Sequence, residues 1–96
     1  MKRLFETAAY REWAATLRDR HALFRMSARI NRLMSGNAGD SRPVGEGVSE
    51  MRIHYGPGYR IYYKVHGDEI VILLAGGTKK TQAEDIKLAK RLAANY

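Results

Sequence analysis

The chain has 96 residues, of which 17 are basic and 10 acidic, so its formal net charge is +7, and it contains no cysteine. This length fits one domain, residues 1–96, with one modest core, and the lack of cysteine excludes disulfides and thiolate chemistry. A charge this positive favours nucleic acid, an acidic protein or an anionic membrane as a partner over a merely solvated basic surface.

Two helices are predicted in the first 36 residues. Leu4 and Phe5 suit a short opening strand, and Thr7 can cap a helix that runs to about Arg18. Asp19 can cap a second helix that ends at Gly36. Apolar stripes at helical spacing mark the inner faces, and they consist of Tyr10, Trp13, Ala14 and Leu17, then Leu23, Met26, Ile30, Leu33 and Met34. The second helix also carries three basic residues one turn apart, which fit a solvated face or a surface for phosphates or an acidic protein: Arg25, Arg29 and Arg32.

Residues 35–47 are rich in glycine and predict a long loop. On both sides of Gly56-Pro57-Gly58, strict alternation predicts two antiparallel strands. A three-residue turn would set Ile53 against Ile61, and on the other face His54 against Arg60, Arg52 against Tyr62 and Glu50 against Lys64. We therefore expect an exposed basic and aromatic sheet face made of Glu50, Arg52, His54, Arg60, Tyr62 and Lys64.

The last third of the chain predicts a strand and a helix. After a turn at His66-Gly67-Asp68, the apolar residues 70–75 suit a central strand covered on both faces, ending at Gly76-Gly77-Thr78. Residues 80–95 have helical periodicity. The expected fold is α+β, with an N-terminal helical hairpin packed on one face of a small antiparallel sheet and a C-terminal helix elsewhere.

Several classes of site are not supported by the sequence. The three histidines, His21, His54 and His66, are far apart, so we expect no zinc site and no other cofactor. The glycine-rich loop lacks Gly-Lys-Ser/Thr, which excludes a nucleotide P-loop. With no run of 18 apolar residues and no apolar signal core at the N-terminus, we expect a cytoplasmic protein without a membrane partner.

Several stretches together resemble one family of bacterial toxins. The stretch 51–63 (MRIHYGPGYRIYY) looks like the core motif of RelE/HigB-type toxins, and more narrowly of the addiction module killer protein branch. Stretches 29–33 (RINRL), 36–40 (GNAGD), 44–48 (VGEGV), 73–82 (LLAGGTKKTQ) and 85–86 (DI) agree in the same order. The resemblance implies a RelE-like fold and the toxin of a type II toxin–antitoxin pair, which cleaves mRNA in the ribosome and is blocked by its antitoxin.

The resemblance also implies site residues. The strand before the Gly-Tyr-Arg core carries catalytic basic residues in the family, and here those places hold Glu50 and Arg52, so an acid replaces one lysine. The family's C-terminal tyrosine has no match, because the chain reads Gln82-Ala83-Glu84-Asp85 there. The expected catalytic set is Arg52, His54, Arg60, Lys79 and Lys80. The expected substrate-binding set is Glu50, Tyr62, Lys64, Gln82 and Asp85.

Cleavage by the neighbouring ribose 2′-hydroxyl needs fixed cations and a proton carrier. Cations beside developing oxyanions commonly stabilise the transition state more than any other group does, and guanidinium groups match phosphate oxygens. Imidazole ordinarily titrates nearest neutral pH, so His54 is the first candidate for acid–base catalysis, with Glu50 and Asp85 as alternatives. Tyr62 could stack on a base or donate a proton.

Two other functions remain open. One is a ParE-like inhibitor that binds DNA gyrase on the same fold, and the other is a non-catalytic basic module that binds RNA or protein. The motif around His54 and Arg60 and the Lys79-Lys80 pair favour the nuclease. The expected partners are mRNA, the ribosome and a cognate antitoxin of helix-turn-helix type from the neighbouring gene.

Overall fold

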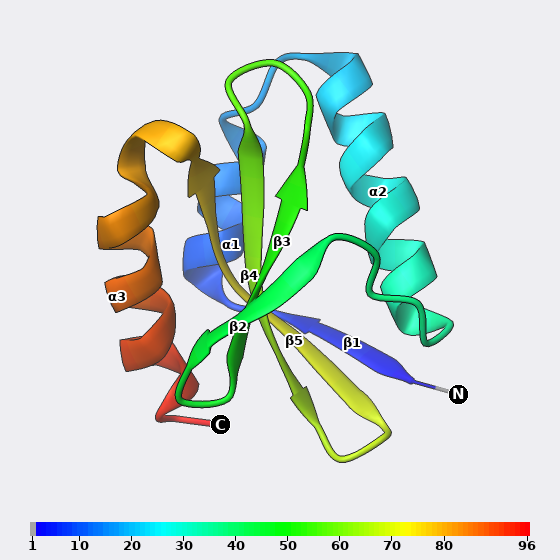
Figure 1. Cartoon of the computed structure of the whole chain (residues 1–96), viewed down its shortest axis with the longest axis vertical. Helices are drawn as coiled ribbons and strands as arrows, with labels where there is room; N and C mark the ends of the chain where they lie inside the picture. Colours follow the sequence, from blue (N-terminus) through cyan, green and yellow to red (C-terminus); the bar gives the residue numbers. More distant parts are fainter. Residues whose placement is uncertain (1) are drawn as a thin grey trace.

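The computed structural model describes residues 2–96 as a five-stranded sheet with helices on both faces (Figure 1). The strand order is β1-β5-β4-β3-β2. β1 runs parallel to β5 and the other neighbours are antiparallel, so the sheet is mixed and not wholly antiparallel as expected. The strands are β1 (Arg3–Glu6), β2 (Ser41–Gly45), β3 (Val48–Ile53), β4 (Tyr59–His66) and β5 (Ile70–Thr78).

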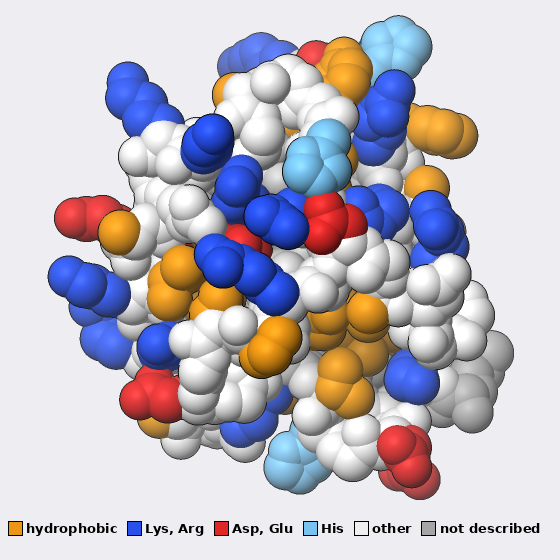
Figure 2. All heavy atoms as spheres, in the orientation of Figure 1, with side chains coloured by type: hydrophobic (Ala, Val, Ile, Leu, Met, Phe, Trp, Pro, Cys, Tyr) orange, Lys and Arg blue, Asp and Glu red, His pale blue; other side chains and the backbone are white. Residues whose placement is uncertain are grey.

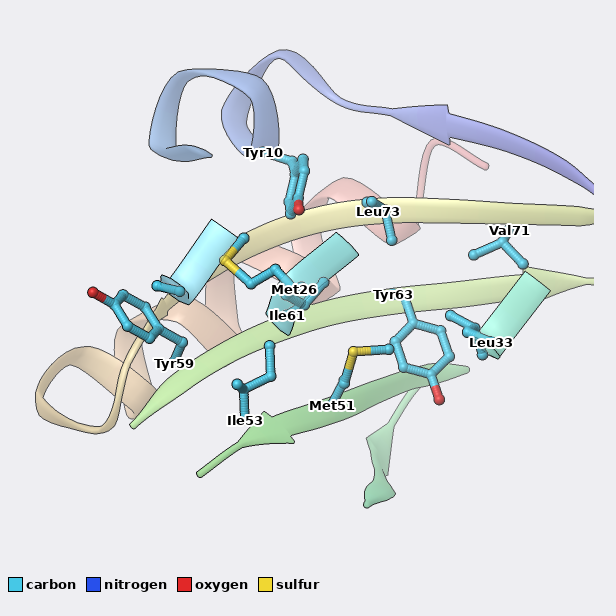
Figure 3. Packing of buried hydrophobic residues seen from close by; sticks show 11 residues of the cluster. Tyr10, Met26, Leu33, Met51, Ile53, Tyr59, Ile61, Tyr63, Val71 and Leu73 are labelled. Carbon is cyan, nitrogen blue, oxygen red and sulfur yellow. The ribbon is translucent and has the colours of Figure 1, made fainter. Parts of the chain in front are cut away.

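The two N-terminal helices, α1 (Ala8–Ala15) and α2 (Arg20–Met34), cover one face of the sheet. Both predicted caps are confirmed, because the Thr7 hydroxyl accepts from Tyr10 N and the Asp19 carboxylate accepts from His21 N and Ala22 N. Figure 3 shows the side chains of this core gathered between the helices and the sheet; they include Tyr10, Met26, Leu33, Met51, Ile53, Ile61, Tyr63 and Leu73.

The predicted helical hairpin is matched only in part, because the two helices share one face of the sheet but are not packed closely on each other. α1 ends at Ala15, three residues early, and a hollow of about 310 Å³ separates it from α2. β1 contributes Leu4 and Glu6 to the walls of this hollow. Each helix therefore packs its own apolar stripe on the sheet instead of packing first on its neighbour.

The C-terminal helix α3 (Gln82–Ala93) follows a short 3₁₀ turn, η1 (Lys79–Thr81), and packs on the opposite face. Its Ala89 and Ala93 are buried against a second cluster that contains Val48, Tyr62 and Leu74. This helix covers part of the sheet face that was expected to be open. No helix in the described part of the chain is long and apolar enough to cross a membrane.

The register between β3 and β4 differs from the prediction by two residues. Arg52 lies opposite Arg60, Glu50 opposite Tyr62 and Val48 opposite Lys64. Residues 54–58 form a five-residue loop in which Gly56 and Gly58 both have positive φ, at 56° and 80°. A shift of two residues keeps every side chain on its predicted face, so the alternation alone could not distinguish the two registers.

Five residues of the expected loop at residues 35–47 form a strand, β2. Gly36 ends α2 with φ of 96°, as predicted, but β2 then pairs along β3 with Ser41 opposite Met51 and Arg42 opposite Glu50. Pro43 lies in this strand, which is the edge of the sheet, where a missing N–H donor is tolerated. The pairing brings Asp40 and Arg42 beside the polar face of β3.

Candidate functional site

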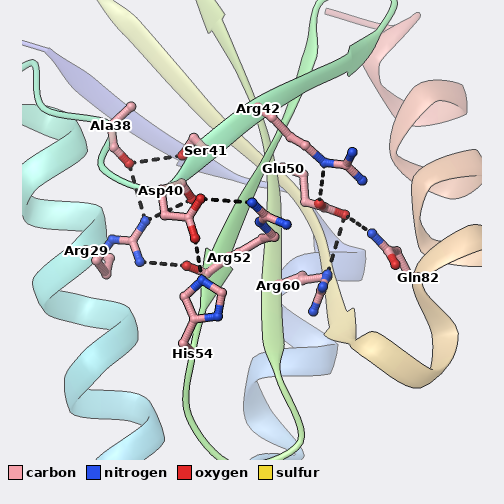
Figure 4. A network of polar contacts seen from close by, with 10 residues as sticks. All are labelled: Arg29, Ala38, Asp40, Ser41, Arg42, Glu50, Arg52, His54, Arg60 and Gln82. Carbon is pink, nitrogen blue, oxygen red and sulfur yellow. Dashed lines mark hydrogen bonds and ion pairs between the residues drawn. The ribbon is translucent and has the colours of Figure 1, made fainter.

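Two arginines face each other at the centre of the candidate site. Arg52 on β3 and Arg60 on β4 are directly paired across the strands and lie on the same face. Like charges in this arrangement repel, so the pair requires neighbouring carboxylates. Figure 4 shows that Glu50 supplies one and Asp40 the other. Among the described residues, the Nε atoms of both arginines are buried without a hydrogen-bond partner.

Glu50 is a fully buried carboxylate that collects donors from three other elements. It accepts hydrogen bonds from Arg42 Nε at 3.1 Å, Tyr62 Oη at 3.1 Å and Gln82 Nε2 at 2.8 Å, and Arg60 Nε lies 3.6 Å away. Burial by itself would raise the pKa of Glu50, but the hydrogen bonds from Gln82, Arg42 and Tyr62 outweigh it and hold the pKa below its usual range. Glu50 is therefore ionised at neutral pH and fixes the position of Arg60.

Asp40 links the end of the α2–β2 connection to Arg52 and His54. Its Oδ1 accepts from Arg52 Nη2 at 3.2 Å, and its Oδ2 accepts from His54 Nε2. The hydrogen bond from His54 is the first cause of a lowered pKa for Asp40, which the Arg52 guanidinium reinforces against the opposing effect of desolvation. An ionised carboxylate only accepts, so Nε2 of His54 is the donor in this contact, and Nδ1 makes no hydrogen bond to the described residues.

Arg29 on α2 holds the backbone beneath this carboxylate. Its Nη1 donates to Arg52 O at 2.7 Å, and its Nη2 donates to Asp40 O at 3.2 Å. One guanidinium thus ties the helix to β3 and to the connection before β2. Neither a solvated face nor a free phosphate-binding surface describes this residue, because both of its Nη atoms donate to backbone carbonyls within the protein.

The remaining cations lie at the end of β5. Lys79 and Lys80 are exposed in η1, and Lys79 N donates to Gly58 O at 3.0 Å. The same carbonyl accepts from Arg60 Nη1 at 3.0 Å. The β3–β4 loop therefore joins η1 to the arginine pair. Asp85 accepts from Thr81 Oγ1 at 2.6 Å and is half-buried at the start of α3.

Most of the predicted site residues are brought together, but Tyr62 and Lys64 are not open to a substrate as expected. Tyr62 is fully buried and donates to Glu50, so its ring is not open for stacking on a base; burial and the Glu50 charge raise its pKa above the usual range. Lys64 reaches the end of α3, where its Nζ donates to Tyr96 O at 3.1 Å and Ala93 O at 3.4 Å. Gln82 contributes by holding Glu50.

Sequence reasoning missed Asp40, Arg42 and the internal role of Arg29. The signal for Asp40 and Arg29 was present, because both belong to stretches that carry the toxin resemblance. Their contacts nevertheless join positions that are far apart in the chain, which periodicity does not reveal. In Figure 2, basic side chains surround a histidine and acidic side chains near the middle of one face of the molecule. Within residues 2–96, no three His, Asp or Glu side chains are grouped to hold a metal ion.

Residues 18–94 match the family described as phage derived protein Gp49-like (DUF891). The chain belongs to the Gp49-like family. It is also 46% identical over 87 residues to an uncharacterized protein of Haemophilus influenzae (strain ATCC 51907 / DSM 11121 / KW20 / Rd), an alignment that covers 91% of this chain and 88% of that protein.

Gp49-like proteins are toxins of toxin–antitoxin systems, which confirms the coarser part of the resemblance and implies an antitoxin partner. The matched region begins at Arg18 and contains every residue of the arginine, histidine and carboxylate cluster. The site described above therefore lies within the part of the chain that carries the Gp49-like family assignment.

Proposed function

We propose that this Gp49-like protein is an endoribonuclease that cleaves ribosome-associated mRNA, so that it inhibits translation until its antitoxin binds. The observation that supports this most is the Arg52–Arg60 pair, with His54 directly after the end of β3. Two guanidinium groups match the oxygens of one phosphate, and an imidazole beside them can move a proton. The RelE-like fold and the RelE/HigB specificity expected from the sequence belong to the same proposal.

In the proposed reaction, Nδ1 of His54 takes the proton from the ribose 2′-hydroxyl. The 2′-oxygen then attacks the adjacent phosphorus, the bond to the 5′-oxygen breaks, and a 2′,3′-cyclic phosphate is left. Arg52 and Arg60 stabilise the charge that develops on the phosphate oxygens. Lys79 or Lys80, both exposed, protonates the departing 5′-oxygen. Asp40 keeps His54 in the required tautomer.

We propose that the residues expected to bind substrate have other roles. Arg42, which is half-exposed beside Glu50, joins Arg52 and Arg60 as a phosphate contact. Glu50, Tyr62 and Gln82 act beneath the surface by positioning those arginines. Asp85 orders the start of α3 through Thr81. We propose no substrate contact for Lys64.

The test is induction of the protein in bacteria with mRNA cleavage mapped by primer extension. We expect Arg60→Ala to lower cleavage by about 10²–10³-fold, because it removes one stabilising charge from the transition state. Arg91→Ala, on the exposed side of α3, removes the same charge elsewhere and serves as the matched control. Cleavage by purified protein with and without ribosomes tests the ribosome requirement.

Other outcomes of the same experiment point to the two alternative functions. Growth arrest with intact mRNA and a DNA-damage response would indicate a gyrase inhibitor. Antitoxin binding without cleavage or growth arrest would indicate a non-catalytic module. Parental cleavage by Arg60→Ala, with an unchanged melting temperature, would show that the proposed site is wrong.

A further inference from the structure

A hollow beside α2 adjoins the candidate site and is lined by arginine, histidine and apolar side chains. Its volume is about 340 Å³, and it opens between one side of α2 and the end of β3. His54 forms part of its wall, so the hollow and the proposed catalytic centre share one side chain. The lining residues are Phe24, Arg25, Ala28, Arg29, Arg32, Ile53 and His54.

The hollow combines positive charge with one exposed aromatic ring. Three of its seven lining residues are arginines and none is acidic. The side chain of Phe24 is 74% exposed, the largest exposed fraction among the large hydrophobic residues that the structure describes. The apolar stripe of α2 instead faces the core through Ala22, Met26 and Leu33. Phe24 therefore does not serve the packing of its own helix.

Two of the three arginines of the hollow, Arg25 and Arg29, are held in place. The Arg25 guanidinium lies 4.8 Å from the centre of the Tyr55 ring, and the Tyr55 hydroxyl donates to Asp19 Oδ2 at 2.9 Å. Arg29 is fixed by the carbonyls of Arg52 and Asp40. A ligand that enters this hollow meets cations whose positions are already set, which lowers the entropic cost of binding.

We propose that this hollow binds an unpaired RNA base, with Phe24 as the stacking surface. The proposal rests on the proposed function and names a subsite for the same substrate, on a nucleotide next to the one that is cut. Single-stranded RNA needs both an aromatic face for its bases and cations for its phosphates. Phe24 supplies the first, and Arg25 and Arg32 supply the second. An apolar peptide would leave these arginine charges unmatched.

Because the hollow and the proposed catalytic centre share His54, one RNA strand can pass from the centre into the hollow. The scissile phosphate lies on Arg52 and Arg60, the attacking ribose lies beside His54, and the strand continues along α2 past Arg32. One base then stacks on Phe24. A base on this surface fixes the register of the strand, so the subsite contributes to the choice of cleavage position.

The experiment measures binding of a fluorescein-labelled 2′-O-methyl RNA octamer by anisotropy at low salt. This probe has no free 2′-hydroxyl within the strand, so it reports binding without cleavage. We expect Phe24→Ala to weaken binding by about 5- to 150-fold, the range for losing one stacked base. Phe24→Trp should retain it, since the aromatic face is kept. Phe5→Ala, at the opposite edge strand and 43% exposed, should bind like the parent.

Two results would overturn this subsite: equal binding of the octamer by the parent and Phe24→Ala, and no binding of the octamer by the parent. Equal RNA binding together with loss of antitoxin binding in Phe24→Ala would assign the hollow to a protein partner. Because Phe24 is exposed, thermal melts should match the parent for each variant. Failure of the proposed nuclease is separate, since it is read from mRNA cleavage and the Arg60→Ala variant.

Discussion

Glu50 organises the candidate site although it cannot touch a substrate. Its carboxylate is fully buried and receives donors from β2, β4 and α3, so three elements converge on one side chain. Without it, Arg60 would be a nearly buried charge with no acid beside it. A buried ion that loses its only opposite charge is strongly destabilising. Glu50 therefore affects stability and the proposed activity together.

We predict that Glu50→Gln lowers the free energy of unfolding at pH 7 by about 3 kcal/mol, as expected when a buried ion pair loses one charge. The pH dependence has a defined sign. The folded-state pKa of Glu50 is lowered, so its stabilisation is present at neutral pH and is lost as the pH falls below 4.5 through that folded-state pKa. Urea melts at several pH values should show a flatter acid dependence in Glu50→Gln. Glu84→Gln, an exposed acid on α3, should leave the parental dependence unchanged.

Asp40 is expected to act through His54. We predict that Asp40→Asn lowers RNA cleavage by about 10- to 100-fold, by analogy with the loss seen when a carboxylate that orients a metal-bound histidine is removed. The side chain of Asp40 is 38% exposed, so the melting temperature should change little. A double-mutant cycle with His54→Ala tests the coupling. If Asp40→Asn still lowers cleavage as strongly in the His54→Ala background, Asp40 does not act by positioning His54.

At the scale of elements, the sequence predicted the order of helices and strands well but not how they meet. Thr7, Asp19 and Gly36 marked their helix ends correctly because capping depends on neighbouring backbone groups. The β3–β4 register was wrong because a two-residue shift preserves the faces. β2 was missed since its five residues include Pro43 and Gly45 and gain their pairing only from β3.

In the candidate site, too, the features that depend on local sequence were predicted and those that depend on how the elements pack were not. Arg52, His54 and Arg60 were found because they follow the period of the strands. The burial of Glu50 and Tyr62 was missed because α3 lies over their face, and the sequence does not show where a helix docks. Asp40 and Arg29 were missed as partners because their bonds cross 14 and 23 positions of the chain. Local patterns carry no information on contacts of that range.

Gly76 and Gly77 let α1 and α3 approach the two faces of β5. A Cβ at Gly76 would overlap the Trp13 ring, and one at Gly77 would overlap the Asp85 carboxylate. We predict that Gly76→Ala lowers the free energy of unfolding by about 1–3 kcal/mol, because the well-packed indole must shift. Gly67→Ala is the comparison, since its Cβ would meet nothing and only the positive φ of 61° opposes it. A smaller loss in Gly76→Ala than in Gly67→Ala, measured by urea melts, would contradict this interpretation.

At the scale of the whole molecule, the charge of +7 is distributed so that the site keeps a surplus of cations. Glu50 and Asp40 are the two acids of the cluster, and they are matched against the guanidinium groups of Arg42, Arg52 and Arg60. Lys79 and Lys80 add exposed charge beside it. The two carboxylates therefore position the arginines without neutralising the positive charge of the site. An anionic RNA or an acidic antitoxin surface would approach this face faster than a neutral one.

The last prediction uses this field to locate the antitoxin. If acidic antitoxin residues cover the site, the association rate should fall as salt rises from about 20 to about 150 mM, since the screening length falls to about 8 Å at physiological ionic strength. Arg42→Ala should lower that rate at low salt more than Arg11→Ala, because Arg42 is a half-exposed cation of the cluster and Arg11 lies on α1. Stopped-flow mixing of the purified partners measures both effects. Equal rates for the two variants would place the antitoxin away from the cluster, so that inhibition would have to act on the site from a distance. A salt-independent rate would contradict the electrostatic argument.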